Sequence, residues 1–356
     1  MAYLKKAIVI KNIIRPYLLA LKPYSSARDE YSGKEGVFLD ANENPYNSVA
    51  GSHLNRYPDP YQQQIKEKLA VIKGVFPEQI FLGNGSDEAI DLLIKATCEP
   101  GKDNIVILPP TYGMYQVCAD IQQIEVKKCN LTADFQLDIT GIAQTVDEHT
   151  KLIFVCSPNN PSGNLINVLD VQGLIDQYPD KLIVIDEAYI DFAKQPSFLT
   201  KLNLHENLVV LQTFSKAWGM AGLRVGMAFA DAELIKILNK IKYPYNLNQV
   251  SQSIVLKALE NEDKKDKYVK RILKERFKLF KELLTLEIVR HIYPSDSNQL
   301  LVKFYDAKAV FEFLLTQKVI VRDRTNVVLC DDCLRISIGT APENEALMEK
   351  LRLFKK

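Results

Sequence analysis

The stretch L-V-V-L-Q-T-F-S-K-A-W-G-M-A-G-L-R-V, residues 208–225, passes from an apolar run into a polar segment that contains two glycines. Its first four residues are aliphatic and β-branched, which predicts a short buried strand. Lys216 follows this strand closely, whereas most lysines are solvated surface residues. Gly219 and Gly222 would let the backbone approach a ligand. We therefore interpret Lys216 as a desolvated nucleophilic amine, of the kind that forms a Schiff base with an aldehyde cofactor.

Length and charge narrow the class of protein. A chain of 356 residues can form one large domain and a smaller one. Its 45 basic and 44 acidic residues nearly cancel, which argues against nucleic acid or an anionic membrane as the main partner. The first residues do not resemble a secretory signal, and no apolar run approaches the ~20 residues of a membrane span. We expect a cytoplasmic protein.

The six cysteines fit free thiols in a reducing compartment. Cys330 and Cys333 form a C-x-x-C pair. Zinc sites usually need a second pair or closely spaced histidines, and the four histidines of the chain are isolated from one another. We therefore expect no metal.

Apolar runs alternate with helical segments through the middle of the chain, at residues 104–108, 124–127, 151–156 and 181–185. This alternation predicts a largely parallel sheet with helices on both faces. In such sheets ligands gather at the carboxyl ends of the strands. The polar clusters of the sequence follow those ends, at residues 109–113, 157–163 and 186–189 and around Lys216.

A glycine turn, G-N-G-S-D-E at residues 83–88, leads into a predicted helix. We expect Ser86 or Asp87 to cap that helix. Unpaired backbone N–H groups at a helix start, next to Gly85, make an anion-binding site. Before this turn we expect mostly loop over residues 1–50, with a short helix near 16–21 and a longer one over 61–73.

The last third of the chain has a different pattern. Pro244 ends a helical run, and residues 262–286 then form an amphipathic helix whose charged side we interpret as a solvated face. Strands are expected over 299–302, 319–321 and 334–338, with a helix over 307–317. This is the pattern of a small α+β domain, and it carries Arg322, Arg324 and Arg335.

The motif S-K-A-W-G-M-A-G-L-R-V-G, which begins at Ser215, resembles the lysine motif of the fold-type I pyridoxal-phosphate (PLP) aminotransferases. N-P-x-G from Asn160 and D-x-A-Y from Asp186 precede it in the order of that family, and Ser162 stands where threonine is commonest. Other motifs resemble the histidinol-phosphate aminotransferases in particular, and the resemblance covers essentially the whole chain. These motifs are N-E-N-P at 42–45, R-Y-P-D-P at 56–60, Y-N-L-N at 245–248 and V-R-D-R at 321–324.

The resemblance implies an α/β fold with three parts. A large PLP-binding domain over residues 51–245 would hold a mostly parallel seven-stranded sheet flanked by helices. A smaller α+β domain would span residues 246–356. Residues 1–50 would form an N-terminal arm and part of the small domain. The family also implies a homodimer with shared active sites.

The resemblance also implies roles for single residues. Lys216 would carry PLP and move a proton, Asp186 would face the pyridinium nitrogen, and Asn160 and Tyr189 would contact the phenolic oxygen. Tyr112 would stack on the ring. The cofactor phosphate would be held by Gly85, Ser86, Asp87, Thr213, Ser215, Arg224 and, from the neighbouring subunit, Tyr57. Substrate contacts would come from Tyr24, Asn44, Arg322 and Arg335.

The implied reaction belongs to histidine biosynthesis. It interconverts histidinol phosphate plus 2-oxoglutarate and imidazole acetol phosphate plus glutamate. The alternatives within the same fold are an aromatic or aspartate-type aminotransferase and a PLP-dependent decarboxylase of a phosphorylated amino substrate. A non-catalytic nucleotide-binding module is a third reading of the glycine turn. That reading lacks a dinucleotide or P-loop glycine pattern and leaves Lys216 without a role.

Overall fold

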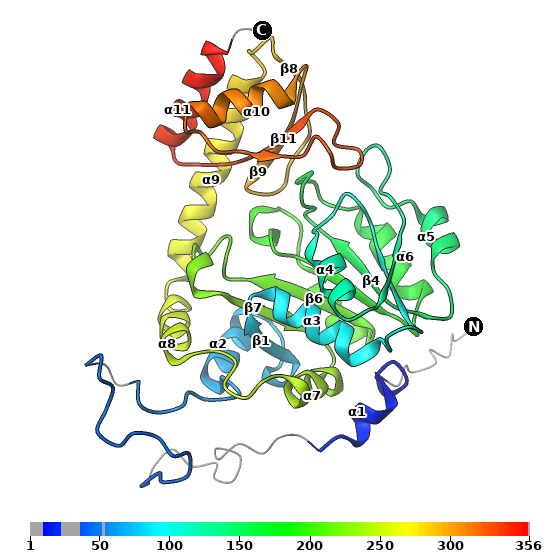
Figure 1. Ribbon diagram of the computed structural model, residues 1–356, viewed down its shortest axis with the longest axis vertical. Helices are drawn as coiled ribbons and strands as arrows, with labels where there is room; N and C mark the ends of the chain where they lie inside the picture. Colours follow the sequence, from blue (N-terminus) through cyan, green and yellow to red (C-terminus); the bar gives the residue numbers. More distant parts are fainter. Residues whose placement is uncertain (1–9, 23–35, 52–53, 355–356) are drawn as a thin grey trace.

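Seven strands form the central sheet of the protein, in the order β1-β7-β6-β5-β4-β2-β3 (Figure 1). The computed structural model describes residues 10–22, 36–51 and 54–354. Strands β3, β2, β4, β5 and β6 are parallel to one another, and β7 runs antiparallel to both β6 and β1. The mostly parallel sheet is thereby confirmed. Its strands are β1 Ile80–Asn84, β2 Asn104–Ile107, β3 Glu125–Lys128, β4 Thr150–Cys156, β5 Leu182–Asp186, β6 Leu208–Thr213 and β7 Val225–Phe229.

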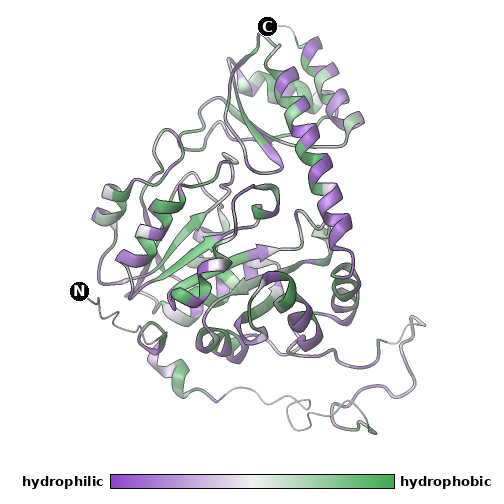
Figure 2. Cartoon of the chain, turned by 180° about the vertical axis from the view of Figure 1, so that it is seen from behind, coloured by the Kyte–Doolittle hydropathy of each residue, from purple (hydrophilic) through white to green (hydrophobic). Residues whose placement is uncertain are grey.

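The central strands are buried on both faces, because their side chains alternate between two apolar layers. In β5, Ile183 and Ile185 belong to one layer, and Leu182 and Val184 belong to the other. All four are fully buried. Continuous apolar strands of this kind are typical of a parallel sheet covered on both sides, and Figure 2 shows them as a hydrophobic centre.

Helices cover each face of the sheet with their apolar sides. The first layer contains residues of α2, α5, α6 and α8, and the second contains residues of α1, α3, α4 and α7. The expected flanking helices are therefore present on both faces. They are α1 Pro16–Ala20, α2 Gln63–Lys73, α3 Ser86–Thr97, α4 Met114–Ile121, α5 Ile139–Thr145, α6 Val168–Gln177, α7 Ala232–Ile241 and α8 Gln249–Ala258.

A second sheet, of order β10-β11-β9-β8, is antiparallel throughout and has its own apolar core. The long helix α9 joins it to the rest of the molecule (Figure 1). Val269 of α9 packs with Tyr189, whereas Leu279 and Leu283 pack in the core of the second sheet. The elements are α9 Glu262–Leu283, β8 Val289–Ile292, β9 Gln299–Phe304, α10 Ala307–Thr316, β10 Arg322–Asp323, β11 Cys333–Ser337 and α11 Ala341–Leu353.

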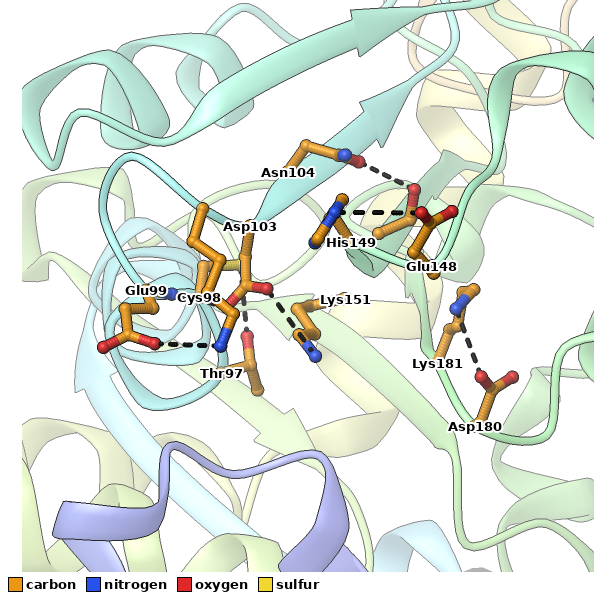
Figure 3. A network of polar contacts seen from close by, with 12 residues as sticks. Thr97, Cys98, Glu99, Asp103, Asn104, Glu148, His149, Lys151, Asp180 and Lys181 are labelled. Atoms are coloured by element: carbon orange, nitrogen blue, oxygen red, sulfur yellow. Dashed lines mark hydrogen bonds and ion pairs between the residues drawn. The ribbon is translucent and has the colours of Figure 1, made fainter.

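Polar contacts close the amino edge of the central sheet (Figure 3). Asn104, at the start of β2, donates from Nδ2 to Asp147 Oδ1 at 2.9 Å. Lys151, near the start of β4, places Nζ 3.7 Å from Oδ1 of the buried Asp103. These charges are paired within the protein, so this edge contrasts with the carboxyl edge, where the functional motifs lie.

Two local predictions are wrong. Residues 319–321 are not a strand, because the Val319 N–H donates to Leu314 O at the end of α10, and pairing with β11 begins only at Arg322. The cap of α3 is Gly85, not Ser86 or Asp87. Gly85 has a φ of 78°, which glycine adopts without strain, and its N–H donates to Arg224 O at 2.8 Å.

The first turn of α3 lies directly against β7. A Cβ atom on Gly226 would lie 2.1 Å from the Ser86 backbone nitrogen and 2.3 Å from the Gly85 carbonyl carbon. Such distances are impossible without moving backbone. The absence of a side chain at Gly226 therefore fixes how closely the start of α3 approaches the sheet.

We expect Gly226→Ala to lower the free energy of unfolding by at least ~2 kcal/mol, because the methyl group overpacks against backbone. Gly173→Ala is the matched control, since Gly173 lies inside α6 and has nothing within 4 Å of its Cβ position. That substitution should stabilise the protein by ~0.5–1 kcal/mol, the usual gain in a helix interior. Urea unfolding of both variants measures the difference. Equal changes in the free energy of unfolding for the two variants would contradict the close approach of α3 to Gly226.

Candidate active site

A cavity of about 670 Å³ opens at the carboxyl ends of β4, β5 and β6. Side chains of the second sheet line its other side, so both parts of the molecule contribute to it. Most residues expected from the sequence meet here. They are Gly85, Ser86, Asp87, Tyr112, Asn160, Asp186, Tyr189, Thr213, Ser215, Lys216, Arg224, Arg322 and Arg335.

Lys216 lies just beyond β6, in a loop held by backbone hydrogen bonds. Phe214 N donates to Val225 O at 3.1 Å, and Gly219 N donates to Lys216 O at 3.0 Å. The Lys216 amine lies 5.4 Å from the centre of the Tyr189 ring. Although this side chain is exposed to the cavity, the surrounding walls lower the pKa of its amine, chiefly by desolvation and then through the charge of Arg335. A larger fraction of the amine is therefore neutral and able to act as a nucleophile or base.

Asp186 is the last residue of β5 and is only 3% exposed. Its Oδ1 accepts a hydrogen bond from Ala188 N at 3.0 Å, and its Oδ2 accepts one from the Tyr115 hydroxyl at 2.6 Å. Burial raises the pKa of Asp186, and these two hydrogen bonds oppose the rise. A buried carboxylate of this kind suits a cationic partner.

Asn160 and Tyr189 lie close to Arg335, which comes from β11. Arg335 donates from Nη1 to Asn160 Oδ1 at 2.6 Å, a contact between the second sheet and the large domain. Arg335 Nε and Thr111 Oγ1 are buried, belong to residues that line the same cavity, and have no hydrogen-bond partner in the part of the chain that the structure describes. Unpaired buried polar atoms are rare, so a polar ligand in this cavity would satisfy them.

A cradle of donors surrounds the start of α3. The first turn of α3 has no side-chain cap, so its backbone N–H groups remain available. Arg224 places Nη1 3.4 Å from Ser215 Oγ and Nη2 3.4 Å from Asp87 Oδ2. Thr213 Oγ1 lies 3.0 Å from Ser215 Oγ. A helix N-terminus, two hydroxyls and a guanidinium together suit a phosphate group.

Three arginines face the cavity from the second sheet. Arg322 and Arg335 are directly paired across β10 and β11, and Arg324 lies next to them. Burial lowers the pKa of Arg324, and the neighbouring charges of Arg335 and Arg322 lower it further. Within residues 36–51 and 54–354, no carboxylate lies at ion-pair distance from any of the three. This wall of the cavity is therefore suited to an anionic ligand.

The family model for class I and II aminotransferases matches residues 31–351. A histidinol-phosphate aminotransferase of Cytophaga hutchinsonii is 51% identical over 98% of this chain and the whole of its own length. One of Parabacteroides distasonis is 50% identical over 97% of this chain and 99% of its own. The chain belongs to the histidinol-phosphate aminotransferase family.

Solved structures show the same fold. The histidinol-phosphate aminotransferase of Sinorhizobium meliloti, in complex with pyridoxal-5'-phosphate, has a TM-score of 0.78 and 22% identity, over 88% of this chain and 90% of its own. L-threonine-O-3-phosphate decarboxylase of Porphyromonas gingivalis has a TM-score of 0.72 and 21% identity, over 85% and 91%. Because transaminase and decarboxylase share the fold, it is sequence identity that places this chain among the histidinol-phosphate aminotransferases.

Two residues expected from the family, Asn44 and Tyr57, do not line this cavity, and a third cannot be placed. Asn44 caps its own turn, where its Oδ1 accepts from Tyr46 N at 2.9 Å. Tyr57 is 51% exposed and stacks on Tyr245 with ring centres 4.5 Å apart. Tyr24 lies outside the described residues. Neither Asn44 nor Tyr57 therefore meets the other site residues within one subunit's described structure.

Sequence reasoning missed two residues that the structure brings into the site. Tyr115 contacts Asp186 from beneath the cavity, and its one sequence signal is its place three residues after Tyr112. Arg324 lines the cavity beside Arg322, and the R-D-R spacing is its signal, because alternate residues of an extended chain share a side.

The residues present fit PLP, the cofactor of this aminotransferase family. The donor cradle at α3 matches a phosphate in charge and hydrogen bonding. Asp186 offers a buried anion for a ring nitrogen, and Lys216 lines the same cavity. Thr111 Oγ1 supplies a buried polar atom that has no partner among the described residues.

Proposed function

We propose that this protein is a PLP-dependent aminotransferase of histidine biosynthesis. It interconverts histidinol phosphate plus 2-oxoglutarate and imidazole acetol phosphate plus glutamate. The observation that carries the proposal is the position of Lys216. Its side chain lines one cavity together with a phosphate-type cradle and three arginines for which no carboxylate lies at ion-pair distance among residues 10–22, 36–51 and 54–354. The chain is also about half identical to aminotransferases of that name.

When bound, PLP supplies an aldehyde that reacts with amines and a ring that withdraws electrons from the substrate α-carbon. Lys216 Nζ is the amine that holds the cofactor and, once displaced by substrate, the base that moves the α-proton. Its lowered pKa keeps more of it neutral, as a base requires. Asp186, an anion buried at the end of β5, holds the proton on the ring nitrogen.

Two further groups orient the ring and the phosphate. Asn160 and Tyr189 would donate hydrogen bonds to the phenolic oxygen, and Tyr112 would cover the ring face. The α3 turn at Gly85, Ser86 and Asp87, together with Thr213, Ser215 and Arg224, holds the phosphate. Because these residues would hold both the ring and the phosphate of PLP, the reacting carbon would stay beside Lys216.

The arginine wall supports a substrate with more negative charge than one carboxylate. Glutamate carries an α-carboxylate, whereas histidinol phosphate carries a phosphate ester on the carbon that replaces it. Arg335 can meet either anion through a bidentate contact. A phosphate dianion is larger and more highly charged, so it needs the additional donors that Arg322 and Arg324 supply.

No helix in the described residues is long and apolar enough to cross a membrane.

Lys216→Ala is expected to abolish transamination while free PLP still binds weakly through the phosphate cradle. In the unchanged enzyme, borohydride reduction should attach the cofactor's mass to the peptide that contains Lys216, as peptide mass spectrometry would show. Lys201→Ala, in a helical turn away from the cavity, is the matched control and should keep both activity and labelling. Cofactor mass on any other lysine would refute the assignment.

Arg322→Ala is expected to lower kcat/KM for histidinol phosphate by ~2–4 kcal/mol in transition-state terms, as when one partner of a desolvated charge pair is removed. The half-reaction with glutamate should lose less, because its carboxylate relies on Arg335. Single-turnover absorbance changes, measured with each amino donor separately, distinguish the histidinol-phosphate half-reaction from the glutamate half-reaction. Arg290→Ala, at an exposed position of β8, is the control.

Equal losses with both donors would assign Arg322 to the common anion site or to stability. Faster reaction with aspartate or phenylalanine than with histidinol phosphate would favour an aspartate-type or aromatic aminotransferase. Release of carbon dioxide from a phosphorylated amino acid would favour the decarboxylase.

The active protein is proposed to be a homodimer with shared sites. Residues 36–51 run away from the rest of the subunit (Figure 1), and Val37, Leu39, Tyr46 and Val49 are each at least 86% exposed. A second subunit would cover such an apolar segment. It would also give Tyr57 a cofactor phosphate to contact, since Tyr57 does not line the cavity of its own subunit.

Sedimentation at micromolar concentration should give twice the chain mass of 40.4 kDa. Tyr57→Phe should weaken PLP binding, and mixing it with Lys216→Ala subunits should restore normal affinity in the mixed dimers. There, the intact Lys216 site receives Tyr57 from the other subunit. A fully active monomer, or no restoration on mixing, would contradict sharing.

A further inference from the structure

Tyr115 is a fully buried tyrosine on α4, beneath the floor of the cavity. Its ring stacks on Phe154 of β4, with centres 4.6 Å apart and planes 16° apart. The ring of Tyr112 meets it edge-on at 5.6 Å. The phenol is therefore held from two sides, and its hydroxyl has a fixed direction.

That hydroxyl donates to Asp186 Oδ2 at 2.6 Å, a short hydrogen bond between two buried side chains. The other oxygen, Oδ1, accepts from Ala188 N at 3.0 Å. Cys156 Sγ also lies close to the tyrosine hydroxyl, on the strand that pairs with β5 at Asp186. Each carboxylate oxygen thus has one fixed donor, which sets the plane of the carboxylate.

These hydrogen bonds offset the free-energy cost of burying an ionised carboxylate. A carboxylate removed from water favours its neutral form, and a neutral carboxyl could not pair with a cation. Among the charged groups that act on Asp186, Asp87 opposes ionisation and Lys216 favours it, while burial lowers the pKa of Lys216 itself. A hydrogen bond donated to the charged form therefore matters more here than it would at the surface.

We propose that Tyr115 is a positioning residue that keeps Asp186 ionised and oriented toward the ring nitrogen of PLP. This inference rests on the proposed function, because it takes Asp186 as the partner of that nitrogen. Tyr115 is fully buried and does not line the cavity. It acts only through Asp186, by strengthening the contact between the Asp186 carboxylate and the ring nitrogen.

Two ligands distinguish this role from simple packing. PLP has the ring nitrogen, and its 1-deaza analogue has a C–H in that position but the same aldehyde and phosphate. Tyr115→Phe removes one oxygen and leaves the ring between Phe154 and Tyr112. In the full-length chain freed of cofactor and then titrated, we expect this variant to bind PLP on the order of tenfold more weakly, as for loss of one hydrogen bond to a charged group. Binding of the analogue should change by less than ~2-fold, well within the scatter of unrelated substitutions.

Two controls define the result. Tyr178→Phe makes the same chemical change at a partly buried tyrosine away from the cavity, and it should leave both affinities unchanged. In an Asp186→Asn background, Tyr115→Phe should cause little further loss of PLP affinity, because the two residues act through one contact. Unfolding transitions measured in parallel show whether each variant is intact.

Equal weakening toward PLP and the analogue would show that Tyr115 only supports the packing of the site, and would overturn the proposal. Unchanged PLP affinity would overturn it as well, while leaving the proposed aminotransferase function intact. A full additional loss in the Asp186→Asn background would also contradict it. Failure of the unchanged protein to bind either compound would contradict the proposed function itself.

Discussion

The parallel direction of β4, β5 and β6 is the constraint on which the site depends. Parallel strands end on the same edge of a sheet, so the residues that follow them converge although they are far apart in the chain. Asn160, Asp186 and Lys216 come together in this way around one cavity. The helices on both faces bury the strands completely, which keeps the strand ends in fixed positions.

The two edges of the sheet treat charge differently. At the amino edge, Lys151 and Asp103 are paired within the protein. At the carboxyl edge, three arginines have no carboxylate at ion-pair distance in the described chain, and Asp186 is buried without a cation at hydrogen-bond distance. A buried carboxylate without a cation, and like-charged arginines side by side without an anion, are both unfavourable unless a ligand completes them. The electrostatics of the molecule therefore point to a charged ligand at one edge only.

The second sheet completes the site through a small number of contacts. The hydrogen bond from Arg335 to Asn160 joins the two sheets across the cavity, and α9 runs from the packing around Tyr189 to the core of the second sheet. A change in the position of the second sheet would therefore move the arginines relative to Lys216. This arrangement couples the substrate-binding wall to the residues that carry out the chemistry.

The sequence by itself determined the sheet class and most of the cavity lining, because apolar runs, glycine turns and the lysine motif are local patterns that follow strand ends. It did not determine the cap of α3, where Gly85 takes a positive φ and its N–H donates to Arg224 O beside β7. It also gave no sign that Tyr115 meets Asp186, 71 positions away. Contacts of that kind depend on how α4 packs against β4 and β5, and only the tertiary structure decides such packing.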